Sequence, residues 1–552
     1  MEHKFLTPTE MWENFNPVKE PLEESVERLY EKGSLQFTEA FFTSETAEDG
    51  KVRVYIKHVK DKNWDGKRPA VIIFPNLGEK SEIDIVLETL VSHGYCAAVV
   101  DYAGFIADGK RSTFPKSLFF AEYDNAKNAL GYMGVSARET PWFVWAKIAR
   151  RAITYISSQS CVDADKIGVI GLAHGAQIVW LVSGIDGRIK AAMPIIGCGG
   201  TRYEKKPAVK NSLEEQDEER CWISGVGPET YARFVSCPLL YSTTSNSTFA
   251  DVDKAWDIVS SVPYGKKGLL ISPKTNFQIE RNNFLAMMTW LDTFINGEGR
   301  DLPMPKIKLY VENGKLYLNL DAGEKPKAVE IYCSEGKNPP PTRDWLLLSD
   351  ELKDNLVYEV AVRENADVIY AFANVTYDDD ITLSSAVVSA EPLAMGVKDI
   401  HPAVVDTSRI IYSGDMGISA FSIETFALIM DYSALTVKEG PFGIKGVSTT
   451  GGYLVTTMLT KSKYAEEKDS ILKMDIFSKD PREIRIQLIS YKLNKSYTAR
   501  VVLVGGELWQ KVLLTAQDFK SEDGKTLSRF SDMEKAVFKN VANVIINNII
   551  WI

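Results

Sequence analysis

The chain has 552 residues, of which 45% are hydrophobic and 25% are charged, a composition typical of folded globular proteins. At about 100–200 residues per domain, this length predicts three or four domains with cores large enough to fold without disulfides. The formal net charge of −10 argues against a nucleic-acid partner, because sequence-independent binding needs a basic surface that displaces counterions.

The six cysteines are widely spaced and form no CxxC pair, and the first residues are acidic rather than apolar. No stretch approaches 18 uninterrupted apolar residues, the length that a membrane-spanning helix needs. We therefore expect reduced thiols, no secretory signal, no membrane partner and a cytoplasmic setting.

Residues 1–302 alternate short β-branched runs with helical periods. The strand-like runs are 71–74, 96–100, 167–170, 190–196 and 239–242. Such alternation is typical of βαβ units and of a mostly parallel, doubly wound sheet. The segment 297–305 contains two glycines and two prolines, which break both helix and strand and therefore predict a linker.

After this linker the sequence shows strand-like runs without intervening helical periods. Asn313-Gly314 separates two alternating runs, which predicts a β-hairpin with a primed turn. Further strand-like runs occur at 328–332, 357–362 and 368–375. We expect residues 306–391 to form a small, all-β sandwich of the immunoglobulin or fibronectin kind.

Residues 400–552 are also rich in strands. The runs 471–477 and 483–489 alternate with period two, and the apolar end of the chain is expected to pair in a sheet. The segments 508–514, 518–519, 530–532 and 546–551 resemble galactose-binding-like jelly rolls, an architecture that many carbohydrate-binding modules share. That resemblance makes Trp509 and Tyr453 candidates for stacking on a sugar ring, although aromatic residues in strands usually belong to the core.

One segment of the first region carries a chemical motif. Residues 167–176 read Ile-Gly-Val-Ile-Gly-Leu-Ala-His-Gly-Ala, a strand followed by a tight turn and a helix. Gly171 and Gly175 have the spacing of G-x-S-x-G, in which a serine nucleophile sits on a strained turn between a strand and a helix. Ala173 stands at the serine position, and alanine has no nucleophilic atom.

With this motif in place, residues 1–302 resemble the α/β-hydrolase superfamily, near the branch of acetyl xylan esterases and dienelactone hydrolases. Other segments that match the family are 74–78, 100–104, 140–142 and 162–168. The resemblance covers a little over half of the chain and implies a serine carboxylic-ester hydrolase fold. It also implies an oxyanion hole made by the backbone N–H groups of Leu77 and His174.

The same resemblance shows what is missing. The family places its acid after the strand that follows Cys237-Pro238, where this chain has Asn246, and its histidine on a loop where this chain has Phe277 or Gln278. An asparagine, a phenylalanine or a glutamine cannot do the proton chemistry of a triad. The nearby Asp251 and Asp253 leave a shifted acid open.

The five histidines decide against a shifted base. They are His3, His58, His93, His174 and His401, and none lies between the acid loop and the linker. We interpret the combined loss of serine, acid and histidine as natural degeneration rather than as a single engineered change.

Two residues offer substitute chemistry. Cys198, in Ile-Gly-Cys-Gly-Gly, is expected at the carboxyl edge of the sheet, but a cysteine nucleophile still needs a base. His174 follows the nucleophile position, where a packing role is the commoner one. The sequence has no motif for a nucleotide or a metal, so we expect no cofactor and no metal site.

Three hypotheses remain. In the first, the chain has lost hydrolytic activity and acts as a binding or scaffold protein, with a small molecule as one kind of ligand. In the second, it is an active carboxylic-ester hydrolase with a non-standard catalytic set. In the third, it binds carbohydrate through its C-terminal jelly roll. The missing triad favours the first and third, because fold alone is a poor guide to function. The sequence leaves the oligomeric state open.

Overall fold

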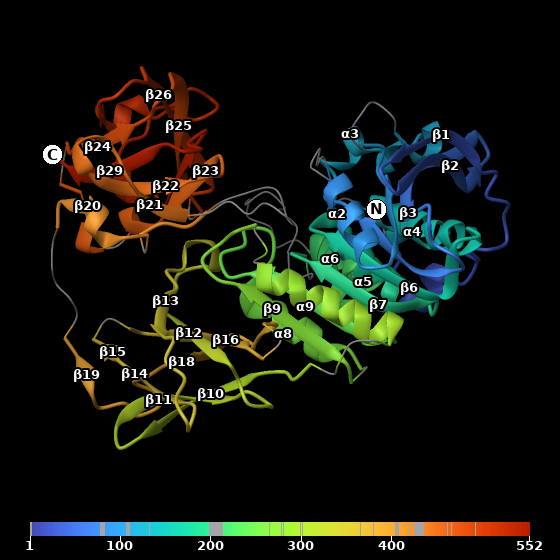
Figure 1. The fold of residues 1–552 in the computed structure, drawn as a ribbon, viewed down its shortest axis with the longest axis horizontal. Coiled ribbons are helices and arrows are strands. Elements are labelled where there is room, and N and C mark those ends of the chain that lie inside the picture. Colours follow the sequence, from blue (N-terminus) through green and yellow to red (C-terminus); the bar gives the residue numbers. More distant parts are fainter. Residues whose placement is uncertain are drawn as a thin grey trace.

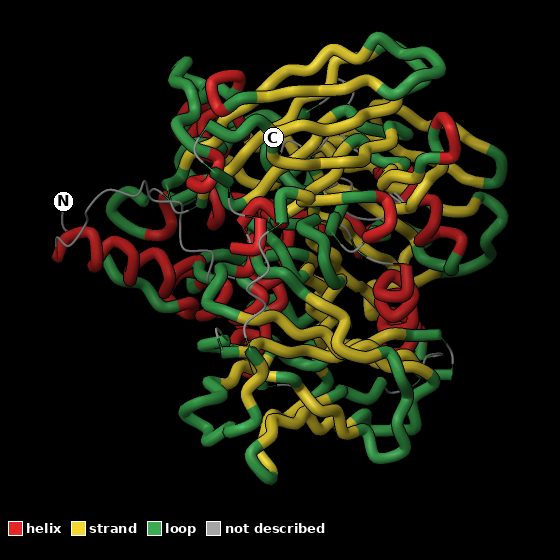
Figure 2. The backbone as a smooth tube through the Cα atoms, turned by 90° about the vertical axis from the view of Figure 1, so that its left-hand side faces the viewer, coloured by secondary structure: helices red, strands yellow, loops and turns green. Residues whose placement is uncertain are grey.

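The computed structural model describes residues 3–552 except 78–82, 106–110, 132, 198–212, 264, 278, 280, 298–299, 301, 365, 379, 403–407, 419, 424–434, 461, 465, 468 and 492. Figure 1 shows three regions that follow one another along the chain: an N-terminal region with helices around a sheet, a middle region of strands below it, and a C-terminal region of strands. In Figure 2 most of the long helices gather on the side of the N-terminus, whereas strands surround the C-terminus.

Within the described residues, nine strands form the N-terminal sheet in the order β1-β2-β3-β5-β4-β6-β7-β8-β9. Their bounds are β1 (Ser25–Lys32), β2 (Leu35–Ala47), β3 (Gly50–Asp61), β4 (Arg68–Phe74), β5 (Cys96–Val100), β6 (Val162–Leu172), β7 (Ile189–Ile195), β8 (Leu239–Thr244) and β9 (Lys267–Ser272). The series β5-β4-β6-β7-β8-β9 is parallel throughout, whereas β1 with β2, β2 with β3 and β3 with β5 pair antiparallel. This mixed sheet confirms the predicted α/β class.

Helices pack on this sheet. The α-helices of the region are α1 (Pro8–Trp12), α2 (Ile83–Ser92), α3 (Tyr123–Ala126), α4 (Pro141–Ser158), α5 (His174–Ser183), α6 (Leu213–Val226), α7 (Pro228–Tyr231), α8 (Val252–Ser261) and α9 (Arg281–Leu291). The longest of them, α4, is capped at its N-terminus by Thr140, whose hydroxyl accepts a hydrogen bond from the Phe143 N–H. No helix in the described part of the chain has the length and apolar character that a membrane crossing requires.

The middle region consists of short strands. They are β10 (Lys306–Glu312), β11 (Lys315–Asp321), β12 (Ala328–Glu335), β13 (Leu346–Ser349), β14 (Val357–Val360), β15 (Val362–Arg363), β16 (Ile369–Thr376), β17 (Thr382–Ser384), β18 (Val388–Ala390) and β19 (Ile400–His401). Glu312 pairs with Lys315 across Asn313 and Gly314, whose φ angles are 48° and 77°. Two positive φ angles define the primed turn that the sequence predicts. Because β19 pairs with β15, residues 400–401 belong to this region rather than to the next one.

The buried apolar residues of the middle region are continuous with those of the N-terminal region. One hydrophobic core runs from Leu6 through the N-terminal sheet to Val397. Strand β9 ends the N-terminal sheet, and an edge strand carries unpaired backbone groups. At Ile271 these groups are satisfied from the middle region, because the N–H donates to Ser384 Oγ at 2.7 Å and the carbonyl accepts from Asn374 Nδ2 at 3.2 Å.

The C-terminal region has a second core, which reaches from Ile411 to Trp551. Its strands are β20 (Ile410–Tyr412), β21 (Leu435–Glu439), β22 (Lys445–Thr449), β23 (Tyr453–Thr456), β24 (Leu472–Phe477), β25 (Arg482–Ser490), β26 (Lys495–Leu503), β27 (Gln510–Leu514), β28 (Lys535–Lys539) and β29 (Ile545–Trp551). Within the described residues they form two antiparallel sheets, which supports an all-β region. Leu472 pairs with Trp551, so the apolar end of the chain lies in a sheet, as predicted.

Candidate functional site: an elbow without a nucleophile

Ala173 lies at the turn between β6 and α5, where the motif predicts it. Its backbone has φ 50° and ψ −105°, and its side chain is fully buried. A non-glycine residue with positive φ is uncommon and strained, and such strain clusters at functional sites. The turn therefore has the strained geometry of a nucleophile elbow, with a methyl group in place of a reactive side chain.

Both glycines of the motif lie so close to backbone atoms that a side chain would not fit. A Cβ atom built on Gly175 would lie 1.9 Å from the carbonyl oxygen of Phe74, and one built on Gly171 would lie 2.2 Å from the carbonyl oxygen of Gly175. Both obstacles are backbone atoms, which cannot rotate away. The close approach of strand and helix that the spacing predicts is therefore present.

The two segments proposed for an oxyanion hole meet at this edge of the sheet. Leu77 follows β4, and His174 begins α5 after the neighbouring strand β6. His174 Nδ1 lies 2.7 Å from Asn76 Oδ1, so this histidine ties the two segments together. An amide oxygen only accepts hydrogen bonds, so His174 donates in this contact when its Nδ1 carries the proton.

The His174 ring lies in a row of aromatic side chains, the elbow aromatic row, formed by Trp142, His174, Phe249 and Phe277. Its ring centroid is 6.1 Å from that of Trp142 and 4.7 Å from that of Phe249, and Phe249 lies 6.4 Å from Phe277. Phe277, one of the two residues that the resemblance places at the histidine position, is buried. Its apolar ring packs with the aromatic side chains of this row.

Burial lowers the pKa of His174 to about 4, and it also lowers the pKa of His58 to about 4. The unfolded chain binds these protons near pH 6.5, so the stabilisation by a neutral imidazole is complete above pH 6.5 and is lost as the pH falls toward 4.

Lowering the pH from 7 to 5 should destabilise the wild type more than His174→Gln, because the variant has no imidazole at this position. We expect the two losses of unfolding free energy, measured in urea, to differ by about 2 kcal/mol. Parallel losses in the two proteins would contradict a buried, neutral His174.

Asn246, which the resemblance places at the acid position, forms hydrogen bonds with the middle region. Its side-chain Nδ2 donates to the carbonyl of Arg343 at 2.7 Å and to that of Pro340 at 3.1 Å, while its Oδ1 accepts from Ser245 Oγ at 2.8 Å. Trp345 adds a hydrogen bond from its indole N–H to the Ser245 carbonyl at 3.3 Å. The loop after β8, which carries the acid in the family, is therefore a contact between two regions of this chain.

Both nearby aspartates have partners in the structure. Asp251 caps α8 by accepting a hydrogen bond from the Asp253 N–H at 3.0 Å. Asp253 forms a bidentate pair with the buried Arg343, with distances of 2.6 and 2.7 Å. The Arg343 guanidinium also stacks on the ring of Tyr370, at 3.7 Å. The loop 339–345 of the middle region thus reaches into the place where an acid would act.

The other histidines have partners elsewhere. His3 Nδ1 contacts the Gly134 carbonyl at 3.0 Å, His93 Nδ1 contacts the Thr89 carbonyl at 2.9 Å, and His58 lies on β3 beside Tyr155. His401 lies on β19 in the middle region. Of the candidate residues, Cys198 and Gln278 fall outside the described part of the chain.

The proposed sugar-stacking residues lie on different sheets. Tyr453 begins β23, at the edge of the four-stranded sheet, and Trp509 precedes β27, at the edge of the other sheet. The Trp509 indole N–H donates to the Pro441 carbonyl at 3.1 Å, and its ring lies 6.0 Å from that of Phe477. These two residues therefore do not share one strand face, and sugar stacking stays a prediction.

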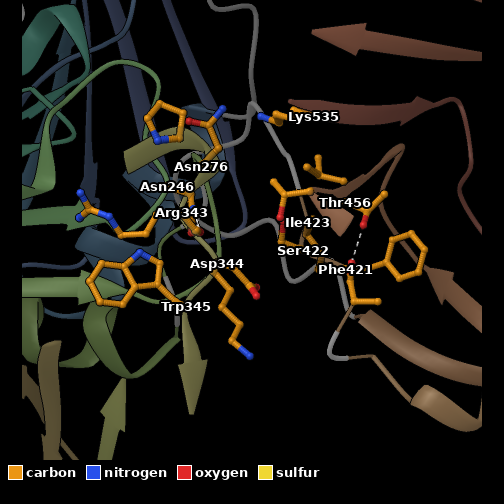
Figure 3. Close-up of a pocket in the computed structure, with 15 residues that line it drawn as sticks. Asn246, Asn276, Arg343, Asp344, Trp345, Phe421, Ser422, Ile423, Thr456 and Lys535 are labelled. Atoms are coloured by element: carbon orange, nitrogen blue, oxygen red, sulfur yellow. Dashed lines mark hydrogen bonds between the residues drawn. The ribbon is translucent and has the colours of Figure 1, made fainter. Parts of the chain in front are cut away.

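A cavity that the sequence did not predict lies where the three regions meet (Figure 3). We call it the junction cavity. The residues that line it are Asn246, Lys274, Asn276, Pro341, Arg343, Asp344, Trp345, Ala420, Phe421, Ser422, Ile423, Val455, Thr456, Thr457 and Lys535. Loops after β8 and β9, which carry the acid and the histidine in the family, form one wall of it. No local sequence signal marks such a cavity, because its walls come from separate segments that range from Asn246 to Lys535.

The sheet order, the strained elbow and the covering helices define residues 1–302 as an α/β-hydrolase region. Residues 53–221 match the model of the Dienelactone hydrolase family. Over these residues the N-terminal region is therefore similar to the Dienelactone hydrolase family. No curated protein gives a significant match to the chain.

Solved structures similar to this chain include two acetyl xylan esterases. One, from a Paenibacillus species, has 16% identity and a TM-score of 0.44, and the match covers 53% of this chain and 97% of that one. The other, acetyl xylan esterase 1 from a Thermoanaerobacterium species, has 12% identity and a TM-score of 0.41, with 53% of this chain and 94% of that one covered.

Proposed function

We propose that this protein is a catalytically silent α/β-hydrolase that acts as a binding or scaffold protein. The observation that carries the proposal is the use made of Asn246. At the acid position its amide donates two hydrogen bonds to carbonyl groups of the middle region. The loop that would supply catalysis therefore holds two regions of the chain together.

The elbow and the base position support the same conclusion. Ala173 has the strained backbone of a nucleophile elbow, but its methyl side chain is not nucleophilic. Phe277, one of the two residues at the proposed base position, has a buried apolar ring. A serine or cysteine nucleophile needs an adjacent base to react at neutral pH. Losing three cooperating groups leaves no partial triad to work with.

The test is the hydrolysis of p-nitrophenyl acetate by the full-length wild type. We expect a rate equal to that of a matched protein blank, apart from an unsaturable background that an intact oxyanion hole can leave. Saturable turnover that Cys198→Ser or His174→Gln abolishes would overturn the proposal and favour an ester hydrolase with a substitute nucleophile or base.

Carbohydrate binding by the C-terminal region is a second candidate, and one observation favours it. Phe442, in the turn whose Pro441 carbonyl accepts the Trp509 N–H, is 82% exposed and has a positive φ of 63°. An exposed aromatic side chain of this kind can stack on a sugar ring, and it lies in the turn that Trp509 contacts through its indole N–H. Sedimentation of the full chain with insoluble xylan would support this candidate if Phe442→Ala weakened it and Phe234→Ala, at an exposed site of the N-terminal region, did not.

A further inference from the structure

Two cysteines that are far apart in the sequence lie side by side at the amino ends of two strands. Cys96 begins β5, and Cys161 lies directly before β6, on either side of β4 in the sheet. The Cys96 thiol points at Cys161, with a distance of 3.8 Å between the two Sγ atoms and 3.7 Å to the Cys161 carbonyl oxygen. This edge of the sheet is opposite to the one that carries the elbow.

We propose that Cys96 and Cys161 form a modification site at which a hydroperoxide oxidises the thiol pair to a reversible disulfide. A disulfide bond is about 2.05 Å long, so the sulfur atoms must approach by less than 2 Å. Cys161 lies in the turn after α4 and is partly exposed, which gives it room to move and access to a small oxidant. The other described cysteines, Cys221, Cys237 and Cys333, are buried.

The surroundings assign different roles to the two thiols. The hydrogen bond from Cys96, together with the positive charge of Lys60, lowers the pKa of the Cys161 thiol to about 6. The same hydrogen bond and burial raise the pKa of the Cys96 thiol. The lowered pKa gives Cys161 a larger thiolate fraction at neutral pH than a free cysteine has, and the thiolate is the nucleophile.

The reaction balances in two steps. The Cys161 thiolate attacks one oxygen of hydrogen peroxide, which breaks the O–O bond and gives a sulfenic acid and hydroxide. Cys96 then attacks the sulfenic sulfur, the S–S bond forms, and the sulfenic oxygen leaves as water with the Cys96 proton. Two electrons pass from the thiols to the peroxide, and a dithiol reductant reverses the change.

The test treats the full chain, reduced beforehand, with hydrogen peroxide, and then counts thiols after denaturation and maps linked peptides by mass spectrometry. We expect the loss of two thiols, a mass lower by two hydrogens, one Cys96–Cys161 linkage and full reversal by dithiothreitol. Cys96→Ser should stop at a sulfenic acid on Cys161 that dimedone traps, and Cys161→Ser should form no linkage.

Cys237→Ser is the matched control, because burial raises the pKa of the Cys237 thiol to about 12 and it should take no part. Cys198→Ser should also leave the linkage intact. Six thiols remaining after treatment, a linkage through any other cysteine, or equal oxidation of the wild type and Cys161→Ser would overturn the proposal.

Discussion

Replacing Asp253 by asparagine is expected to lower the free energy of unfolding by about 3–5 kcal/mol, because it leaves the buried guanidinium of Arg343 without its charge partner. The Arg343 side chain is 1% exposed, and both of its terminal nitrogens bond to Asp253, at 2.6 and 2.7 Å. Urea unfolding measures the loss. Because the pair joins α8 to the middle region, Asp253→Asn should also increase proteolysis in the linker 297–305.

The matched control lies on the same helix. Asp257 pairs with Lys254 at 3.7 Å, and both side chains are at least 60% exposed. Exposed ion pairs are worth about 0–1 kcal/mol, so Asp257→Asn should unfold almost like the wild type. Equal losses for Asp253→Asn and Asp257→Asn would show that the Arg343 pair does not hold the two regions together.

The second large effect is expected at the elbow. Gly175→Ala should prevent folding or cost more than about 4 kcal/mol, because the new methyl group would lie 1.9 Å from the Phe74 carbonyl oxygen. Helix propensity alone predicts the opposite sign, since alanine is favoured over glycine by about 1 kcal/mol inside a helix. Soluble yield and the circular dichroism midpoint measure the outcome.

Gly187→Ala is the control for this substitution, because nothing lies within 4 Å of a Cβ atom at that position. It should keep the wild-type midpoint within a few degrees. A Gly175→Ala protein that folds as well as Gly187→Ala would mean that strand and helix do not approach as closely as the elbow geometry requires.

Much of the first region is predictable because its signals are local. Gly171 and Gly175 mark the turn, and the buried strands β4 and β5 are short, unbroken apolar runs. Strands β1, β2 and β3 were not predicted from the sequence. β1 is exposed along nearly its whole length and has no apolar face, so its pairing with β2 leaves no periodic signal.

For the candidate site, the sequence predicts only that the serine, acid and histidine of the family are missing. Alanine at the nucleophile position can be read from the motif, but the role that replaced catalysis depends on residues about 100 positions away. The bond from Asn246 to Arg343 and the packing of Phe277 on Phe249 arise from tertiary structure. Likewise, no spacing rule links Cys96 to Cys161, which the sheet order brings together across β4.

The most direct test of catalytic silence is the rate of p-nitrophenyl acetate hydrolysis by Ala173→Ser. Serine would restore the nucleophile's oxygen at this turn, but on our proposal it would lack the adjacent base that a serine needs to react at neutral pH. We predict a rate equal to that of the wild type and of a protein blank, in a variant whose circular dichroism spectrum is unchanged. Saturable turnover by Ala173→Ser would contradict it, because that result requires a working base beside the elbow.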